Sequence, residues 1–137
     1  MFLYIDFRND TQAIALVTRA EGVKWVRGEA RRGEFALLTE AAEKFALTVG
    51  PPQAVAAAIW PGGSTDVSWS TARTAVTVAN TLAFAWGVPA VGLDASGVTE
   101  EGLADAVREA MAGVRPNARI DVAYSGDPNI SQPKKIF

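Results

Sequence analysis

The feature that restricts the fold most is an unbroken apolar run at residues 54–60, Ala-Val-Ala-Ala-Ala-Ile-Trp. Pro52 precedes the run, and Pro61, Gly62 and Gly63 follow it, so residues that break regular structure close it at both ends. A strand with one face in solvent alternates apolar and polar side chains, whereas a strand covered on both faces does not. We therefore predict that residues 54–60 form an interior strand, with other elements packed on both of its faces.

Three further β-type segments come before this run. They are residues 2–7, 11–18 and 23–30, which are rich in residues that favour strands and are separated by polar turn-forming residues and glycine. Short connections of this kind join antiparallel neighbours. We predict that these segments form a three-stranded antiparallel meander.

Helical periodicity replaces the strand pattern later in the chain. Apolar side chains recur every three or four positions from residue 34, until a Gly-Pro-Pro sequence at 50–52 interrupts them. The predicted helices are residues 34–49, 70–86 and 100–112, the second with a surface of almost only Ala, Val and Thr, and the third with Thr99 as its N-cap. A short strand is predicted at residues 90–93, and an edge strand at residues 119–124.

The predicted order is therefore β-β-β-α-β-α-β-α, a meander followed by alternating helices and strands. Such an order predicts an α/β fold, with one mixed five-stranded sheet flanked by helices. It resembles the plan of a single ribonuclease-H-like lobe of the actin, sugar-kinase and Hsp70 superfamily, which is an analogy of fold alone. We assign residues 1–124 to this lobe and residues 125–137, which contain two prolines, to an extended C-terminal tail.

Composition excludes several classes of function. Cys and His are absent from the 137 residues, which removes the usual zinc ligands, the thiolate nucleophile and the commonest proton-transfer side chain. We expect neither a cofactor nor a metal. The net charge of −2 provides no overall positive field for binding nucleic acid. The apolar start, residues 1–5, lacks basic residues and is too short for a signal peptide or a membrane span, so we expect a cytoplasmic protein without membrane contact.

Several motifs, in a consistent order, resemble those of the bacterial TsaB (YeaZ) family, accessory proteins in threonylcarbamoyladenosine (t6A) modification of tRNA. The matching segments are residues 1–6, an opening strand that ends in aspartate; 32–38, with Arg, then Glu, then Leu-Leu; 68–73, Ser-Trp-Ser-Thr-Ala-Arg; 82–85; 88–92; and 128–134. Thr65-Asp66-Val67 departs from the Gly-Pro-Gly of the family. The second lobe-like region of most members also has no counterpart here, so the resemblance is to a pared-down, divergent member.

The resemblance implies a non-catalytic scaffold subunit. In this family the first two helices pack on the equivalent helices of the catalytic paralogue TsaD, the ATPase TsaE joins the assembly, and tRNA is met only through the complex. The same surface would form a homodimer when the partner is absent. The implied contacts are Phe35, Leu38, Ala42, Ala75, Val78, Ala79 and Leu82. On this assignment, Ala79→Arg would abolish formation of the heterodimer and leave the fold intact.

Two other functions stay open. Asp6 ends the first strand, where this superfamily places a catalytic or metal-linked carboxylate, and Gly62 and Gly63 resemble a phosphate-binding loop. No glycine follows Asp6 in Phe7-Arg8, and no lysine accompanies the glycine pair, so these are degenerate nucleotide-site positions. The first alternative is an enzyme lobe that binds nucleotide, related to metalloprotease-like or sugar-kinase-like proteins. The second is a structural homodimer that shares only the fold.

Overall fold

The computed structural model describes residues 1–7, 11–18, 22–29, 34–59, 69–94, 98–99 and 101–121. Its elements are β1 (Phe2–Asp6), β2 (Thr11–Thr18), β3 (Gly22–Glu29), α1 (Glu34–Lys44), β4 (Ala54–Ile59), α2 (Trp69–Trp86), β5 (Ala90–Asp94) and α3 (Leu103–Met111). This is the predicted order of elements. The predicted α/β architecture, with one mixed five-stranded sheet flanked by helices, is confirmed.

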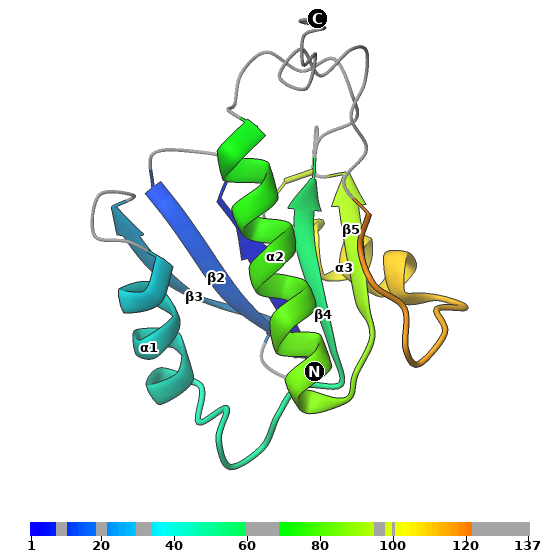
Figure 1. Cartoon of the computed structure of the whole chain (residues 1–137), viewed down its shortest axis with the longest axis horizontal. Coiled ribbons are helices and arrows are strands. Elements are labelled where there is room, and N and C mark those ends of the chain that lie inside the picture. Colours follow the sequence, from blue (N-terminus) through cyan, green and yellow to red (C-terminus); the bar gives the residue numbers. More distant parts are fainter. Residues whose placement is uncertain are drawn as a thin grey trace, which may run out of the picture.

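The sheet has the strand order β3-β2-β1-β4-β5 (Figure 1). β2 is antiparallel to β1 and β3, whereas β4 runs parallel to both β1 and β5. Ile5 pairs with Ile14 of β2 and with Ala57 of β4, so β1 and β4 lie inside the sheet. Residues 54–58 are all buried, which confirms that the apolar run is a strand covered on both faces.

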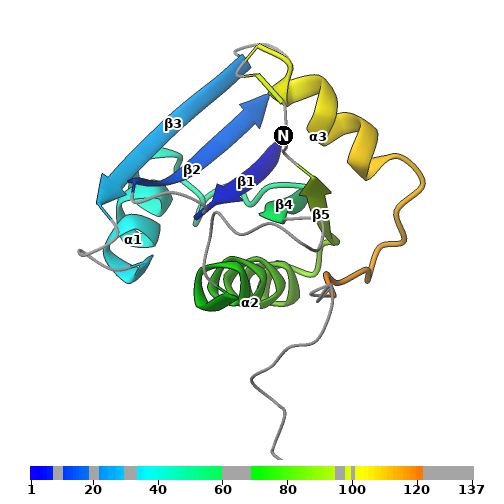
Figure 2. The same cartoon turned by 90° about the horizontal axis from the view of Figure 1, so that it is seen from above.

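The two faces of the sheet carry separate hydrophobic clusters, because successive side chains of a strand point to opposite sides. Leu3 and Ile5 belong to the cluster beneath α1 and α2, whereas Tyr4 belongs to the cluster beneath α3. Figure 2 shows α1 and α2 on one side of the sheet and α3 on the other. α1 packs on β2 and β3, α2 packs mainly on β4, and α3 packs on β5 and β3. The sheet is therefore the middle of three layers.

The end of α1 differs from the prediction, which continued the helix to residue 49. Ala46 has a φ of 52°, in the left-handed region, and this conformation ends the helix. The N–H of Leu47 donates to the carbonyl of Ala42 at 3.0 Å, and the N–H of Ala46 donates to that of Glu43 at 3.3 Å. These two bonds form a Schellman motif. Periodicity missed it because alanine ordinarily continues a helix.

α2 ends in the same motif, with glycine in the left-handed position. Gly87 has a φ of 68°. The N–H of Val88 donates to the carbonyl of Ala83 at 2.9 Å, and the N–H of Gly87 donates to that of Phe84 at 3.2 Å. The two helices on this face thus share one kind of C-terminus and differ in the residue that adopts it.

α3 begins at Leu103, later than predicted, because a turn comes before it. The N–H of Gly102 donates to Oγ1 of Thr99 at 3.1 Å, and Gly102 itself is the N-cap residue. The prediction that Thr99 caps the helix is therefore wrong. Thr99 closes the preceding turn instead.

The segment after α3 packs against α2 and β5 without forming the predicted strand over residues 119–121. The side-chain amide of Asn80 donates to the carbonyl of Ile120 at 3.0 Å, and its oxygen accepts the N–H of Ile120 at 2.8 Å. The N–H of Ala90 donates to the carbonyl of Ala118 at 2.9 Å. A side chain, not a strand ladder, thus satisfies the backbone of Ile120. Residues 122–124 and the predicted tail, 125–137, lie outside the described residues.

Candidate protein–protein interface

One face of α2 is closed by the sheet. Ala75, Ala79 and Ala83 repeat every fourth residue, have no exposed surface and belong to the cluster that includes Val55 and Ala57 of β4. Their small size lets a backbone approach closely, as the sequence indicated, but the backbone that approaches is that of the chain's own sheet. The prediction that Ala75 and Ala79 contact a partner is therefore corrected, because both residues are fully buried against the chain's own sheet.

The opposite face of α2 is exposed. Its exposed residues are Arg73, Thr77, Thr81, Phe84 and Ala85. Phe84 is 77% exposed, an unusual position for a large aromatic side chain. The predicted contact set did not include it. Its spacing was a usable signal, since it lies three residues after Thr81 and seven after Thr77 and so shares their side of the helix.

The two flanks of α2 face different neighbours. Asn80 holds the segment at Ile120, so this flank faces the C-terminal part of the described chain. Residues two positions apart on a helix project to nearly opposite sides, because each residue turns the helix by about 100°. Val78 and Leu82 therefore project from the other flank. Both are half-buried and pack against the cluster beneath α1 and α2.

The same argument orients α1. Nζ of Lys44 donates to the carbonyl of Trp25 at 2.9 Å, so the Lys44 flank faces β3 at the sheet edge. Ala42 lies two residues before Lys44, and Leu38 lies one turn before Ala42, so both project from the opposite flank, toward α2. They too are half-buried against the shared cluster.

Four half-buried apolar side chains therefore lie on the flanks by which α1 and α2 face each other over the shared cluster. We call Leu38, Ala42, Val78 and Leu82 the α1–α2 seam. All four belong to the predicted contact set, and the structure brings them to the same side of the sheet. Phe35, the remaining predicted contact, is the second residue of α1, and its side chain is not among those that the structure describes.

The degenerate nucleotide-site positions have a different geometry. Asp6 ends β1 and accepts a hydrogen bond at Oδ2 from the hydroxyl of Tyr4, at 3.1 Å. Asp94 ends the parallel strand β5 at the same end of the sheet. Tyr4 and Leu93 both face α3, so alternation directs Asp6 to the α3 side and Asp94 to the α1–α2 side. These two carboxylates do not converge on one ligand. Gly62 and Gly63 lie outside the described residues.

None of the helices in the described ranges combines the length and apolarity needed to cross a bilayer.

No family model matches this sequence. No curated protein matches it either. Among solved structures, YeaZ from Pseudomonas aeruginosa is similar, with a TM-score of 0.54 and 17% sequence identity. A second similar structure, an uncharacterized protein with similarity to peptidase YEAZ from the same organism, has a TM-score of 0.53 and 18% identity. Each alignment covers 67% of this chain and 42% of the known structure, so the chain spans less than half of these proteins.

A likeness at this level of identity concerns the fold. The aligned part of this chain therefore has the fold of the matching part of YeaZ, and the predicted ribonuclease-H-like plan of the sheet is confirmed.

Proposed function

We propose that this chain is a divergent TsaB-type subunit without catalytic activity of its own. It binds a TsaD-type catalytic paralogue through α1 and α2 and supports t6A modification of tRNA. A TsaE-type ATPase joins the same assembly, and tRNA contacts the complex rather than this chain. The observation that carries the proposal is the apolar α1–α2 seam beside the exposed face of α2, which carries Phe84.

The chemistry of this surface suits helix packing. The seam residues are already half-buried, so a partner helix laid along them removes further apolar surface from water. Thr77, Thr81 and Ala85 on the exposed face of α2 are small, which permits the short interaxial distances of packed helices. Among the side chains of this face that the structure describes, Phe84 is the large apolar one that is exposed, and it acts as the anchor that enters the partner.

Co-expression with the cognate TsaD-type protein, followed by size-exclusion chromatography, tests the proposal. Thr81→Arg places a long charged side chain on the exposed face and is expected to abolish co-elution. Phe84→Ala is expected to weaken binding about ten-fold or more, because burial of a phenylalanine contributes roughly 1.5–3 kcal/mol. The matched control is Ala112→Arg, which adds the same charge at an exposed position that follows α3.

The circular dichroism spectrum and melting temperature of each variant establish that it is folded. If the folded Thr81→Arg variant still co-elutes with the paralogue like the unaltered chain, the docking surface is assigned incorrectly. In the absence of the paralogue, the same surface is expected to form a homodimer of two-fold symmetry, and Thr81→Arg is expected to make the isolated chain monomeric.

Titration calorimetry with magnesium and ATP distinguishes the rival enzyme function. A scaffold subunit with separated carboxylates at Asp6 and Asp94 is expected to give no binding heat. Micromolar binding of the nucleotide would favour the enzyme lobe instead.

A further inference from the structure

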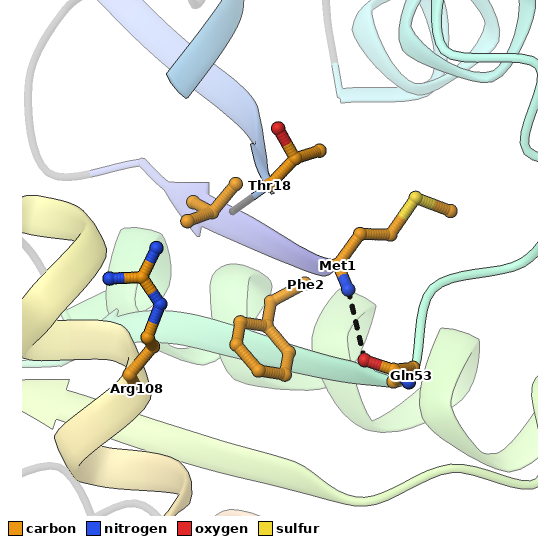
Figure 3. Close-up of a pocket in the computed structure, with 6 residues that line it drawn as sticks. Met1, Phe2, Thr18, Gln53 and Arg108 are labelled. Carbon is orange, nitrogen blue, oxygen red and sulfur yellow. Dashed lines mark hydrogen bonds between the residues drawn. The ribbon is translucent and has the colours of Figure 1, made fainter. Parts of the chain in front are cut away.

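A cavity of about 350 Å³ lies at the end of the sheet opposite Asp6. It is lined by Met1, Phe2, Val17, Thr18, Gln53 and Arg108, which come from the start of β1, the end of β2, the residue before β4, and α3 (Figure 3). Its volume is at the lower end of the range of small-molecule sites. None of its residues belongs to the α1–α2 seam, so its role is independent of the proposed docking surface.

The floor of the cavity is apolar. Phe2 and Val17 are register partners on the neighbouring strands β1 and β2. Val17 is buried in the cluster beneath α3, and the half-buried Phe2 packs against the same cluster. This floor favours a ligand with an apolar body, since contact with it removes apolar surface from water.

The rim of the cavity carries cationic and neutral polar groups. Arg108 lies on one side of Phe2 and Gln53 lies on the other, where the α-ammonium of Met1 donates to Oε1 of Gln53 at 2.9 Å (Figure 3). Nη1 of Arg108 donates to Oδ1 of Asp105 at 3.0 Å. One such bond uses one of the five N–H donors of a guanidinium group. Of the six described residues that line the cavity, none is acidic.

We propose that this cavity binds a small monocarboxylate with an apolar body. The carboxylate accepts hydrogen bonds from Arg108, whose planar group suits a carboxylate better than a lysine would. The apolar body lies on Phe2 and Val17. The cationic rim favours a ligand with a negative charge, and the apolar floor favours a ligand with an apolar body. Tight binding therefore requires a carboxylate and an apolar group on the same molecule.

The proposal is tested by NMR titration of the full chain with phenylacetate, acetate and inorganic phosphate. Phenylacetate is expected to shift the amide signals of Phe2, Val17 and Thr18 and to bind at least five-fold more tightly than acetate or phosphate. Arg108→Gln is expected to weaken phenylacetate binding at least five-fold. The control, Arg115→Gln, removes the same charge from an exposed residue after α3 and is expected to leave binding unchanged.

The result that overturns the proposal is equally specific. It fails if phenylacetate shifts none of the three amides, or if its preference over either anion is below five-fold. It also fails if the folded Arg108→Gln variant binds phenylacetate less than five-fold more weakly than the unaltered chain does. Equal weakening of phenylacetate binding in Arg115→Gln and Arg108→Gln would overturn it as well. Loss of the surface pair with Asp105 has little effect on stability, so the Arg108 variant is expected to fold.

Discussion

The residue that ends α1 provides the sharpest test of the energetics of this fold. Ala46 and Gly87 occupy equivalent positions in two Schellman motifs, with φ values of 52° and 68°. Both residues are exposed, and a Cβ built on Gly87 has no atom within 4 Å. Substitutions between alanine and glycine at these positions therefore change backbone conformational energy and little else. We expect Ala46→Gly to stabilise the protein and Gly87→Ala to destabilise it.

The magnitude follows from two opposing terms. Left-handed backbone costs a residue with a Cβ roughly 1–2 kcal/mol, and Ala46→Gly removes this cost. The greater conformational freedom of glycine stabilises the unfolded chain by roughly 0.5–1 kcal/mol, which offsets part of this stabilisation of the folded state. The net expectation is about 0.5–1 kcal/mol of stabilisation for Ala46→Gly, and a loss of similar size for Gly87→Ala.

Urea unfolding followed by circular dichroism measures these differences. The midpoint is expected to rise for Ala46→Gly and to fall for Gly87→Ala, with the slope unchanged in both variants. The control is Ala85→Gly, at an exposed helical position of α2, where glycine is expected to cost about 0.5–1 kcal/mol. If Ala46→Gly destabilises the chain as much as this control does, the left-handed end of α1 is not the source of strain, and the argument is refuted.

Three further substitutions test the packing of the described residues. Asn80→Ala is expected to lower the free energy of unfolding by about 2 kcal/mol and to reduce the hydrogen-exchange protection of the Ile120 amide, because both hydrogen bonds to Ile120 are lost. Asn80→Asp keeps the acceptor oxygen, so it should protect this amide more than Asn80→Ala does. Gly92→Ala is expected to lower the free energy of unfolding, measured in urea, by about 1–2 kcal/mol, because its Cβ would lie 2.5 Å from Cδ1 of Ile59. Ile59→Val removes that Cδ1 atom, so adding it to Gly92→Ala should recover part of the loss. Ala79→Arg is expected to unfold the chain, seen as loss of helical circular dichroism, because this site has no exposed surface; a folded variant would contradict the orientation of α2.

The sequence by itself determined the elements and their order. Alternation, helical spacing and turn residues are local properties, and they predicted the eight helices and strands of the described residues in the correct order. The apolar run at residues 54–60 also identified the interior strand, because burial on both faces removes the need for polar side chains. The motifs that resemble those of the TsaB (YeaZ) family predicted the fold that the structural comparison found over the aligned part of the chain.

The tertiary structure alone decided which way α2 faces. Ala, Val and Thr occupy most positions on all sides of this helix, so its sequence pattern does not distinguish the side toward the sheet from the side toward solvent. The predicted contact set therefore mixed buried Ala75 and Ala79 with half-buried Val78 and Leu82, and it omitted exposed Phe84.

Two further features depended on the assembled fold. The early end of α1 depends on a left-handed alanine, and the α1–α2 seam exists because two helices far apart in sequence cover the same face of one sheet. Periodicity describes one segment at a time. Contacts between segments depend on how strand pairing and sheet register place them, which no local pattern contains.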